Sequence, residues 1–220
     1  MRISNFKNLI IELPVNNQSF DIKIKNWICE DQSDTIDKIF NGKSIITLNR
    51  FDIINSSWDL KEFVIKTLMW GYPTKGRGKN IDILLKNDNF NNLIIILQEY
   101  VRNDISINKL EKDIKLIDGL GLSTMSKFAY FLNTRIEGFK ALILDQQIID
   151  IVDLERYDEL MILKGINYDN AIKRYKDYLI IIDKLSLLYK TEPENIEMFL
   201  FTFGKNLSEL IGEDGDYSEF

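Results

Sequence analysis

Carboxylates, amines and phenols are the side chains of this 220-residue sequence that could do chemistry, because the sequence contains no histidine. The absence of histidine excludes Ser-His and Cys-His nucleophile pairs, histidine general bases and histidine metal sites. The single cysteine, Cys29, excludes cysteine zinc sites, four-cysteine iron–sulfur clusters and an intramolecular disulfide. Catalysis would have to use Asp, Glu, Lys or Tyr, backbone groups, or a metal held by carboxylates. We expect no cofactor and no metal site.

A Gly-Leu-Gly turn is followed by two hydroxyl side chains. Gly119 and Gly121 are the two glycines, and Ser123 and Thr124 stand where a new helix should begin. Glycine is needed where the backbone takes a positive φ or where another group comes close, and we expect both at Gly121. A tight turn before a helix leaves several N–H groups pointing the same way, which favours phosphate binding. The alternative is an ordinary corner between two helices.

A carboxylate follows the turn. Asp145 ends an apolar run at residues 141–144, lies 24 positions after Gly121, and should open a helix. The two glycines, Thr124 and Asp145 together resemble the helix-hairpin-helix motif of DNA glycosylases related to endonuclease III and 8-oxoguanine glycosylase, with a slightly longer spacing to the Asp. The resemblance implies a mainly α fold, duplex DNA with a modified base as the partner, and cleavage of the N-glycosidic bond of an oxidised or modified purine.

Two segments are similar to a group of bacterial proteins described as 8-oxoguanine-glycosylase-like. They are residues 123–131 and the Trp-Gly-Tyr-Pro sequence at residues 70–73, which Arg77 follows. The whole resemblance covers about residues 58–152. Because this bacterial group is found near phage-defence genes, the resemblance leaves open either a repair enzyme or a role in antiviral defence.

The resemblance implies catalytic roles for Asp145 and Lys127. In the family, the Asp stabilises positive charge on the deoxyribose as the base leaves, and the alternative for Asp145 is helix capping alone. Family enzymes that also act as AP lyases form a Schiff base through a lysine at the place of Ser123. Lys127 lies one helical turn further on the same face and could supply that amine. If Lys127 faces solvent, the protein is a hydrolytic glycosylase or inactive. Gln147 stands in place of a family histidine.

The turn and the helix start after it are expected to contact phosphate through N–H groups and hydroxyls. These contacts come from Gly119, Gly121, Ser123 and Thr124. Trp70 and Tyr72 are expected to stack on an extruded base, although aromatic side chains at helical spacing are more often core. Arg77 lies in a basic loop without acids and is expected to contact phosphate or a guanine-like edge. The alternative for this loop is a solvated surface.

Hydrophobic periodicity predicts the elements that position these residues. A capping box formed by Ser56 and Asp59 should open a helix that Gly71 and Pro73 end. We expect short strands near 20–24 and 44–48 and a short helix near 33–41. Further helices are expected near 81–86, 90–101, 107–116, 124–132, 171–189 and 193–203. This is a mainly α helix-hairpin-helix bundle with a small, partly β N-terminal segment.

The chain is expected to divide into a partly β N-terminal segment at 1–55, a helical glycosylase-like domain at 56–207, and an acidic tail at 208–220. The tail contributes five of the acidic side chains and no basic one, so residues 1–207 carry a net charge of −1 out of the total of −6. The tail suits a protein partner. No apolar run reaches the length of a membrane span and no signal peptide is present, so we expect a cytoplasmic protein.

Three functions remain open at this point. The favoured one is a DNA glycosylase for an oxidised purine such as 8-oxoguanine, with or without AP lyase activity. The second is a catalytically inactive nucleic-acid-binding or adaptor protein with the same fold. The third is a helical interaction protein in which the glycines form only a turn. Salt-dependent duplex binding separates the first two from the third, and base release separates the first from the second.

Overall fold

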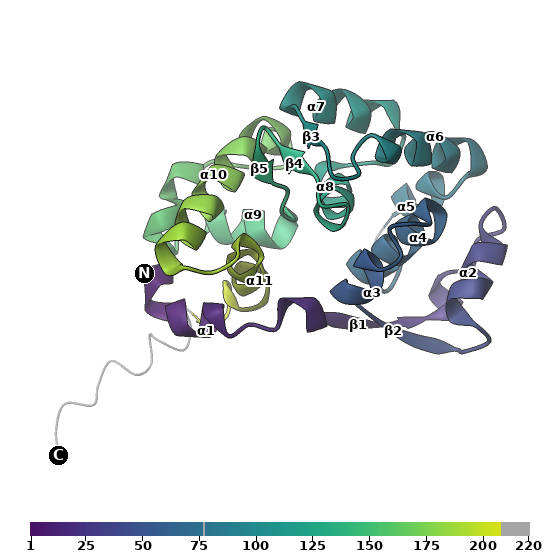
Figure 1. The fold of residues 1–220 in the computed structure, drawn as a ribbon, viewed down its shortest axis with the longest axis horizontal. Helices are drawn as coiled ribbons and strands as arrows, with labels where there is room; N and C mark the ends of the chain where they lie inside the picture. The colour runs from purple at the N-terminus through teal and green to yellow at the C-terminus, as the bar shows by residue number, and fades with distance from the viewer. Residues whose placement is uncertain (77, 208–220) are drawn as a thin grey trace, which may run out of the picture. The chain divides into compact units, whose positions relative to one another are not determined.

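The computed structural model describes residues 1–76 and 78–207, so the predictions for Arg77 and for the tail at 208–220 lie outside the described residues. The described chain is mainly α-helical, as predicted, with two small sheets (Figure 1). It forms two compact units. One contains Pro14–Ile143, and the other joins Met1–Leu13 to the chain from Leu144 onward. The two units meet after Leu13 and after Ile143, not at residue 56. The predicted division at residue 56 remains a prediction.

The unit Pro14–Ile143 combines both sheets with most of the helices. Its elements are 3-10 helices Val15–Asn17 and Ile24–Asn26, strands β1 (Ser19–Lys23), β2 (Ile45–Asn49), β3 (Asp104–Ile105), β4 (Arg135–Ile136) and β5 (Phe139–Lys140), and helices α2 (Ser33–Phe40), α3 (Arg50–Ile54), α4 (Leu60–Gly71), α5 (Asn80–Leu84), α6 (Asn87–Gln98), α7 (Ile107–Leu116) and α8 (Leu122–Phe131). β1 pairs antiparallel with β2, with Ile22 opposite Ile46. β4 lies between β3, which is parallel to it, and β5, which is antiparallel.

Helix α4 is the centre of this unit. It packs against α2, α3, α6, α8 and the β1–β2 sheet, so most of its side chains are buried, and the ion pair between Glu62 and Lys66 lies on its narrow partly exposed face. Phe63 packs on Phe128 of α8 with ring centroids 6.1 Å apart, and Trp70 packs edge-on to Phe131 at 5.3 Å. The pairing of α4 with α8 fixes the helix that carries Lys127.

The start of α4 differs from the predicted capping box. Asp59 caps the helix by accepting N–H groups from Lys61 and Glu62, at 3.1 and 3.3 Å. Ser56 instead donates its hydroxyl to the carbonyl of Ile53 and so closes the preceding helix α3. The prediction that these two residues form one box was wrong, because an isolated Ser can bond backward to a carbonyl as readily as forward to an N–H group.

A buried polar network joins the start of α7 to the end of α6. The Tyr100 hydroxyl donates to Asp113 at 2.8 Å, and the Lys109 ammonium lies 3.0 Å from the same carboxylate. Burial, and then the bond to Asp113, raise the pKa of Tyr100 far above its usual range, so the phenol remains a proton donor. This network anchors α7, the helix that leads into the Gly119–Gly121 turn.

The second unit is helical. Its elements are a 3-10 helix at Ile3–Phe6, α1 (Lys7–Ile11), α9 (Gln146–Asp153), a 3-10 helix at Asp158–Leu163, α10 (Ala171–Tyr189) and α11 (Pro193–Phe203). α11 packs against α1, α9 and α10. Its buried Phe199 contacts Phe6 and Tyr157, with ring centroids 5.3 and 6.1 Å apart. These contacts position α9, which begins directly after Asp145.

Among the described residues, no helix has both the length and the apolar character needed to cross a membrane. In the same part of the chain, no group of three or more Asp, Glu or Cys side chains is arranged to hold a metal ion.

Candidate DNA-binding and catalytic site

The Gly-Leu-Gly turn connects α7 to α8, as predicted. α8 begins at Leu122, slightly earlier than expected, and Gly121 is its N-cap. The positive φ of the turn is at Gly119, with φ +79°, whereas Gly121 has an extended backbone with φ −124°. The expectation of a positive φ at Gly121 was therefore wrong. Only Gly119 needs the left-handed conformation that glycine tolerates.

The turn is held from outside by α5 and α6. A Cβ added to Gly119 would lie 2.7 Å from the carbonyl oxygen of Asn80, at the start of α5. Asn89 of α6 donates its side-chain amide to the carbonyl of Asp118 at 2.8 Å. The predicted exposed turn is thus half-buried, because neighbouring backbone covers one side of it.

Replacing Gly119 by alanine is expected to destabilise the fold more than the same change at Gly138. Both glycines have a positive φ, which costs an L-residue about 1–2 kcal/mol, but nothing lies within 4 Å of a Cβ at Gly138. At Gly119 the Asn80 carbonyl must also move. Urea unfolding of the two variants measures the difference, and equal losses would contradict a close approach at Gly119.

The side chain of Lys127, in the second turn of α8, reaches back to Ser123 in the first turn. Lys127 is 4 % exposed, and its ammonium donates to the Ser123 carbonyl at 3.0 Å and to the Ser123 hydroxyl at 3.1 Å. Lys127 therefore does not face solvent. Among the described residues it has no carboxylate at ion-pair distance, so hydroxyl, carbonyl and aromatic groups surround the nitrogen.

Tyr72, just after α4, completes this cluster. Its hydroxyl shares a hydrogen bond with Thr124 at 2.8 Å and lies 3.4 Å from the Ser123 hydroxyl. The Lys127 nitrogen lies 5.2 Å from the centroid of the Tyr72 ring, within the range of a cation–π contact. We call Tyr72, Ser123, Thr124 and Lys127 the amine–hydroxyl cluster. All four residues are site candidates from the sequence, but the contacts of Tyr72 with Thr124 and Lys127 were not predicted.

Trp70 lies in the core rather than in this cluster. Its ring is 3 % exposed, its indole N–H donates to the Gln18 carbonyl at 3.0 Å, and the guanidinium of Arg50 lies 5.3 Å from its centroid. A ring enclosed in this way has no free face for a base. Of the two residues expected to stack on a base, only Tyr72 is half-buried rather than enclosed in the core.

Asp145 caps α9, as predicted, by accepting the N–H of Ile148 at 3.2 Å. Its side chain is half-buried, and the apolar residues 141–144 before it are buried. Gln147 is exposed on the first turn of α9. Asp145 and Lys127 belong to different compact units.

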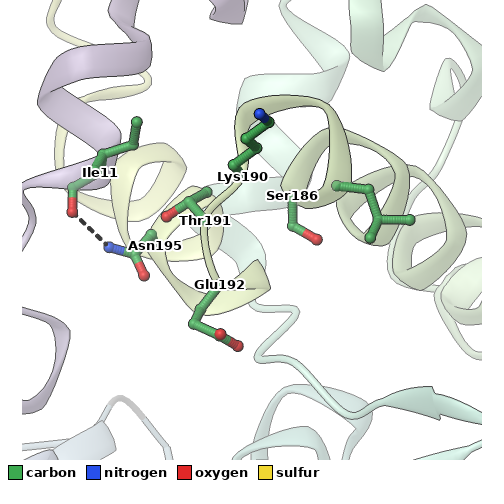
Figure 2. Close-up of a pocket in the computed structure, with 7 residues that line it drawn as sticks. Ile11, Ser186, Lys190, Thr191, Glu192 and Asn195 are labelled. Atoms are coloured by element: carbon green, nitrogen blue, oxygen red, sulfur yellow. Dashed lines mark hydrogen bonds between the residues drawn. The ribbon is translucent and has the colours of Figure 1, made fainter.

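An open pocket of about 510 Å³ lies at the junction of α10 and α11 in the second unit and contains none of the predicted site residues (Figure 2). Figure 2 shows Asn195 pointing toward the end of α1, where its amide donates to the carbonyls of Ile10 and Ile11 at 3.0 and 3.5 Å. Lys190 and Glu192 lie at its rim and are exposed. The hydrogen bonds of this pocket join helices, so they have a structural role.

One protein-family model matches most of the length of the chain. Residues 14–201 match the family model described as "Putative 8-oxoguanine DNA glycosylase OGG-like protein". No curated protein and no solved structure matched the chain. The matched range contains the turn, the amine–hydroxyl cluster and Asp145.

Proposed function

Because the chain belongs to this OGG-like family, we propose that it is a helix-hairpin-helix DNA glycosylase that releases an oxidised or otherwise modified purine from duplex DNA. The observation that supports an enzyme best is the position of the Lys127 nitrogen, 3.1 Å from the hydroxyl of Ser123. Ser123 stands at the place where 8-oxoguanine glycosylase has its lysine. Lys127 lies one helical turn later, and its side chain is long enough to place an amine at that position.

The DNA contacts follow from the turn. The N–H groups of Gly121, Leu122 and Ser123 come before the first hydrogen bond of α8, which Thr124 makes to the Gly121 carbonyl at 3.1 Å, and these three N–H groups bind a phosphate without reading sequence. Gly119 shapes the turn, while the hydroxyls of Ser123 and Thr124 add side-chain contacts. The target nucleotide leaves the stack, and the ring of Tyr72 packs against the extruded base. Arg77 is proposed as a further phosphate contact.

The chemistry requires one carboxylate and one amine. The electron pair of the glycosidic bond leaves with the base, and Asp145 stabilises the positive charge that develops on the sugar. The Lys127 amine, after it loses one proton to solvent, forms a bond to C1′; a second proton passes from its nitrogen to the ring oxygen O4′, the C1′–O4′ bond breaks, and a protonated imine is left. Proton abstraction from C2′ of the imine then expels the 3′ phosphate, which is the AP lyase step.

A screen of modified duplexes tests the function. Duplexes that carry 8-oxoguanine or other oxidised or alkylated purines are incubated with the protein, and free base is measured by mass spectrometry. We expect release of an oxidised purine and duplex affinity that falls steeply with salt, because phosphate contacts release counterions. Salt-dependent binding without base release from any duplex would contradict the enzyme.

A second function is favoured by the replacements at two family positions. Ser123 and Gln147 stand where the resemblance places a lysine and a histidine. A catalytically inactive DNA-binding adaptor with a protein partner for its acidic tail, acting in antiviral defence, accounts for these replacements. It predicts duplex binding, no base release and no borohydride-trapped adduct.

A further inference from the structure

We infer that Gly71 and Tyr72, at the end of α4, position the amine of Lys127 at Ser123. The inference rests on the proposed imine chemistry of Lys127 and assigns positioning roles to two residues of another helix. Its basis is the path that the lysine side chain takes between its backbone on α8 and its nitrogen.

Gly71 provides the space through which the lysine passes. A Cβ added to Gly71 would lie 2.8 Å from Cδ and 3.0 Å from Cε of Lys127, distances that real Cβ atoms rarely show. The backbone of Gly71 is helical and does not have a positive φ. The last turn of α4 therefore does not need glycine for its backbone conformation. The need for a residue without a Cβ at position 71 comes from the Lys127 side chain alone.

Tyr72 borders the far end of the same path. Its ring faces the ammonium at 5.2 Å, and its hydroxyl is fixed by Thr124 at 2.8 Å. The nitrogen therefore has Ser123 on one side and an aromatic face on the other. Among the described residues, the Lys127 nitrogen has no carboxylate at ion-pair distance. Its position is therefore determined by these contacts and by the space that Gly71 leaves for the lysine side chain.

Gly71→Ala tests this arrangement with a duplex that already contains an abasic site, so that base release is not required. The added methyl group should displace the lysine, and the rate of borohydride trapping should fall about 10- to 100-fold, since a shift of about 1 Å can cost that much. Duplex affinity and melting temperature should match the wild type. Trapping at the wild-type rate would overturn the inference, whereas no trapping in the wild type would overturn the imine chemistry.

Reductive methylation with formaldehyde and borohydride in the absence of DNA gives a measurement that does not depend on activity. Lys127 should stay unmodified in the wild type, because it is buried, and become modified in Gly71→Ala, as located by peptide mass spectrometry. Equal modification in the two proteins would overturn the positioning role of Gly71 whatever the trapping result.

Two changes at Tyr72 serve as a matched pair. Tyr72→Phe keeps the ring under the ammonium, whereas Tyr72→Leu removes it. With an abasic-site duplex no base is present to stack, so only the effect on the lysine is measured. We expect trapping to be about 10-fold slower for Tyr72→Leu than for Tyr72→Phe, because only Tyr72→Leu loses the aromatic face beside the ammonium. Equal rates for the two variants would contradict the role of the ring.

Discussion

Asp145→Asn is expected to slow base release by about 100-fold or more and to leave duplex binding unchanged. Removal of one charge-stabilising group commonly costs this much in rate. Asparagine is as good an N-cap as aspartate, so the bond to the Ile148 N–H and the start of α9 should survive. Single-turnover release of the base and affinity for the same duplex are the two measurements.

Asp59→Asn is the matched control for that result. Asp59 also caps a helix, α4, and it undergoes the same chemical change, but it has no proposed part in the reaction. Base release by Asp59→Asn should equal that of the wild type. If Asp145→Asn also retains full activity, the role assigned to its charge is wrong and Asp145 is only a helix cap.

Lys127→Ala is expected to abolish the covalent adduct that borohydride traps between the wild-type protein and an abasic-site duplex. The imine needs an amine at that position, and an alanine cannot supply one. Slower hydrolytic base release through Asp145 should remain. Because a buried lysine stem also fills space, Lys127→Met, which keeps most of the stem, should give the same loss of adduct with less effect on stability.

Lys66→Met controls for the general loss of a partly buried lysine. The Lys66 ammonium lies 2.7 Å from the carboxylate of Glu62 on α4 and has no place in the proposed reaction. The yield of the covalent adduct with Lys66→Met should match that of the wild type. An adduct of normal yield in Lys127→Ala would mean that another amine forms the imine.

The sequence predicted the helices well where apolar residues recur at helical spacing. α7 and α10 begin and end at the predicted residues, 107–116 and 171–189, and β1 and β2 lie within one residue of the strands expected near 20–24 and 44–48. The sheet formed by β3, β4 and β5 was not predicted, because each strand has two residues and alternation needs a longer run. The two compact units were not predicted either, since they join segments far apart in the sequence.

The site was predicted as residue types and only partly as geometry. The cap at Asp145 follows from its place after an apolar run, and the reach of Lys127 follows from its spacing to Ser123. The burial of Trp70 and the space for Lys127 beside Gly71 depend on how α4 packs against α8. A local sequence pattern does not contain that information. A glycine in the last turn of an apolar helix predicts the end of that helix, and Gly71 has the additional role of leaving room for a side chain.

The burial of the Lys127 amine has a consequence for chemical selectivity. Primary amines react with any free aldehyde or ketone that reaches them, including small metabolites. An amine that is 4 % exposed is shielded from such molecules in solution. In the proposed reaction, C1′ of the sugar reaches the nitrogen because the bound DNA delivers it at a fixed place. In the proposed reaction, the same packing that holds the Lys127 amine thus also protects it from such side reactions.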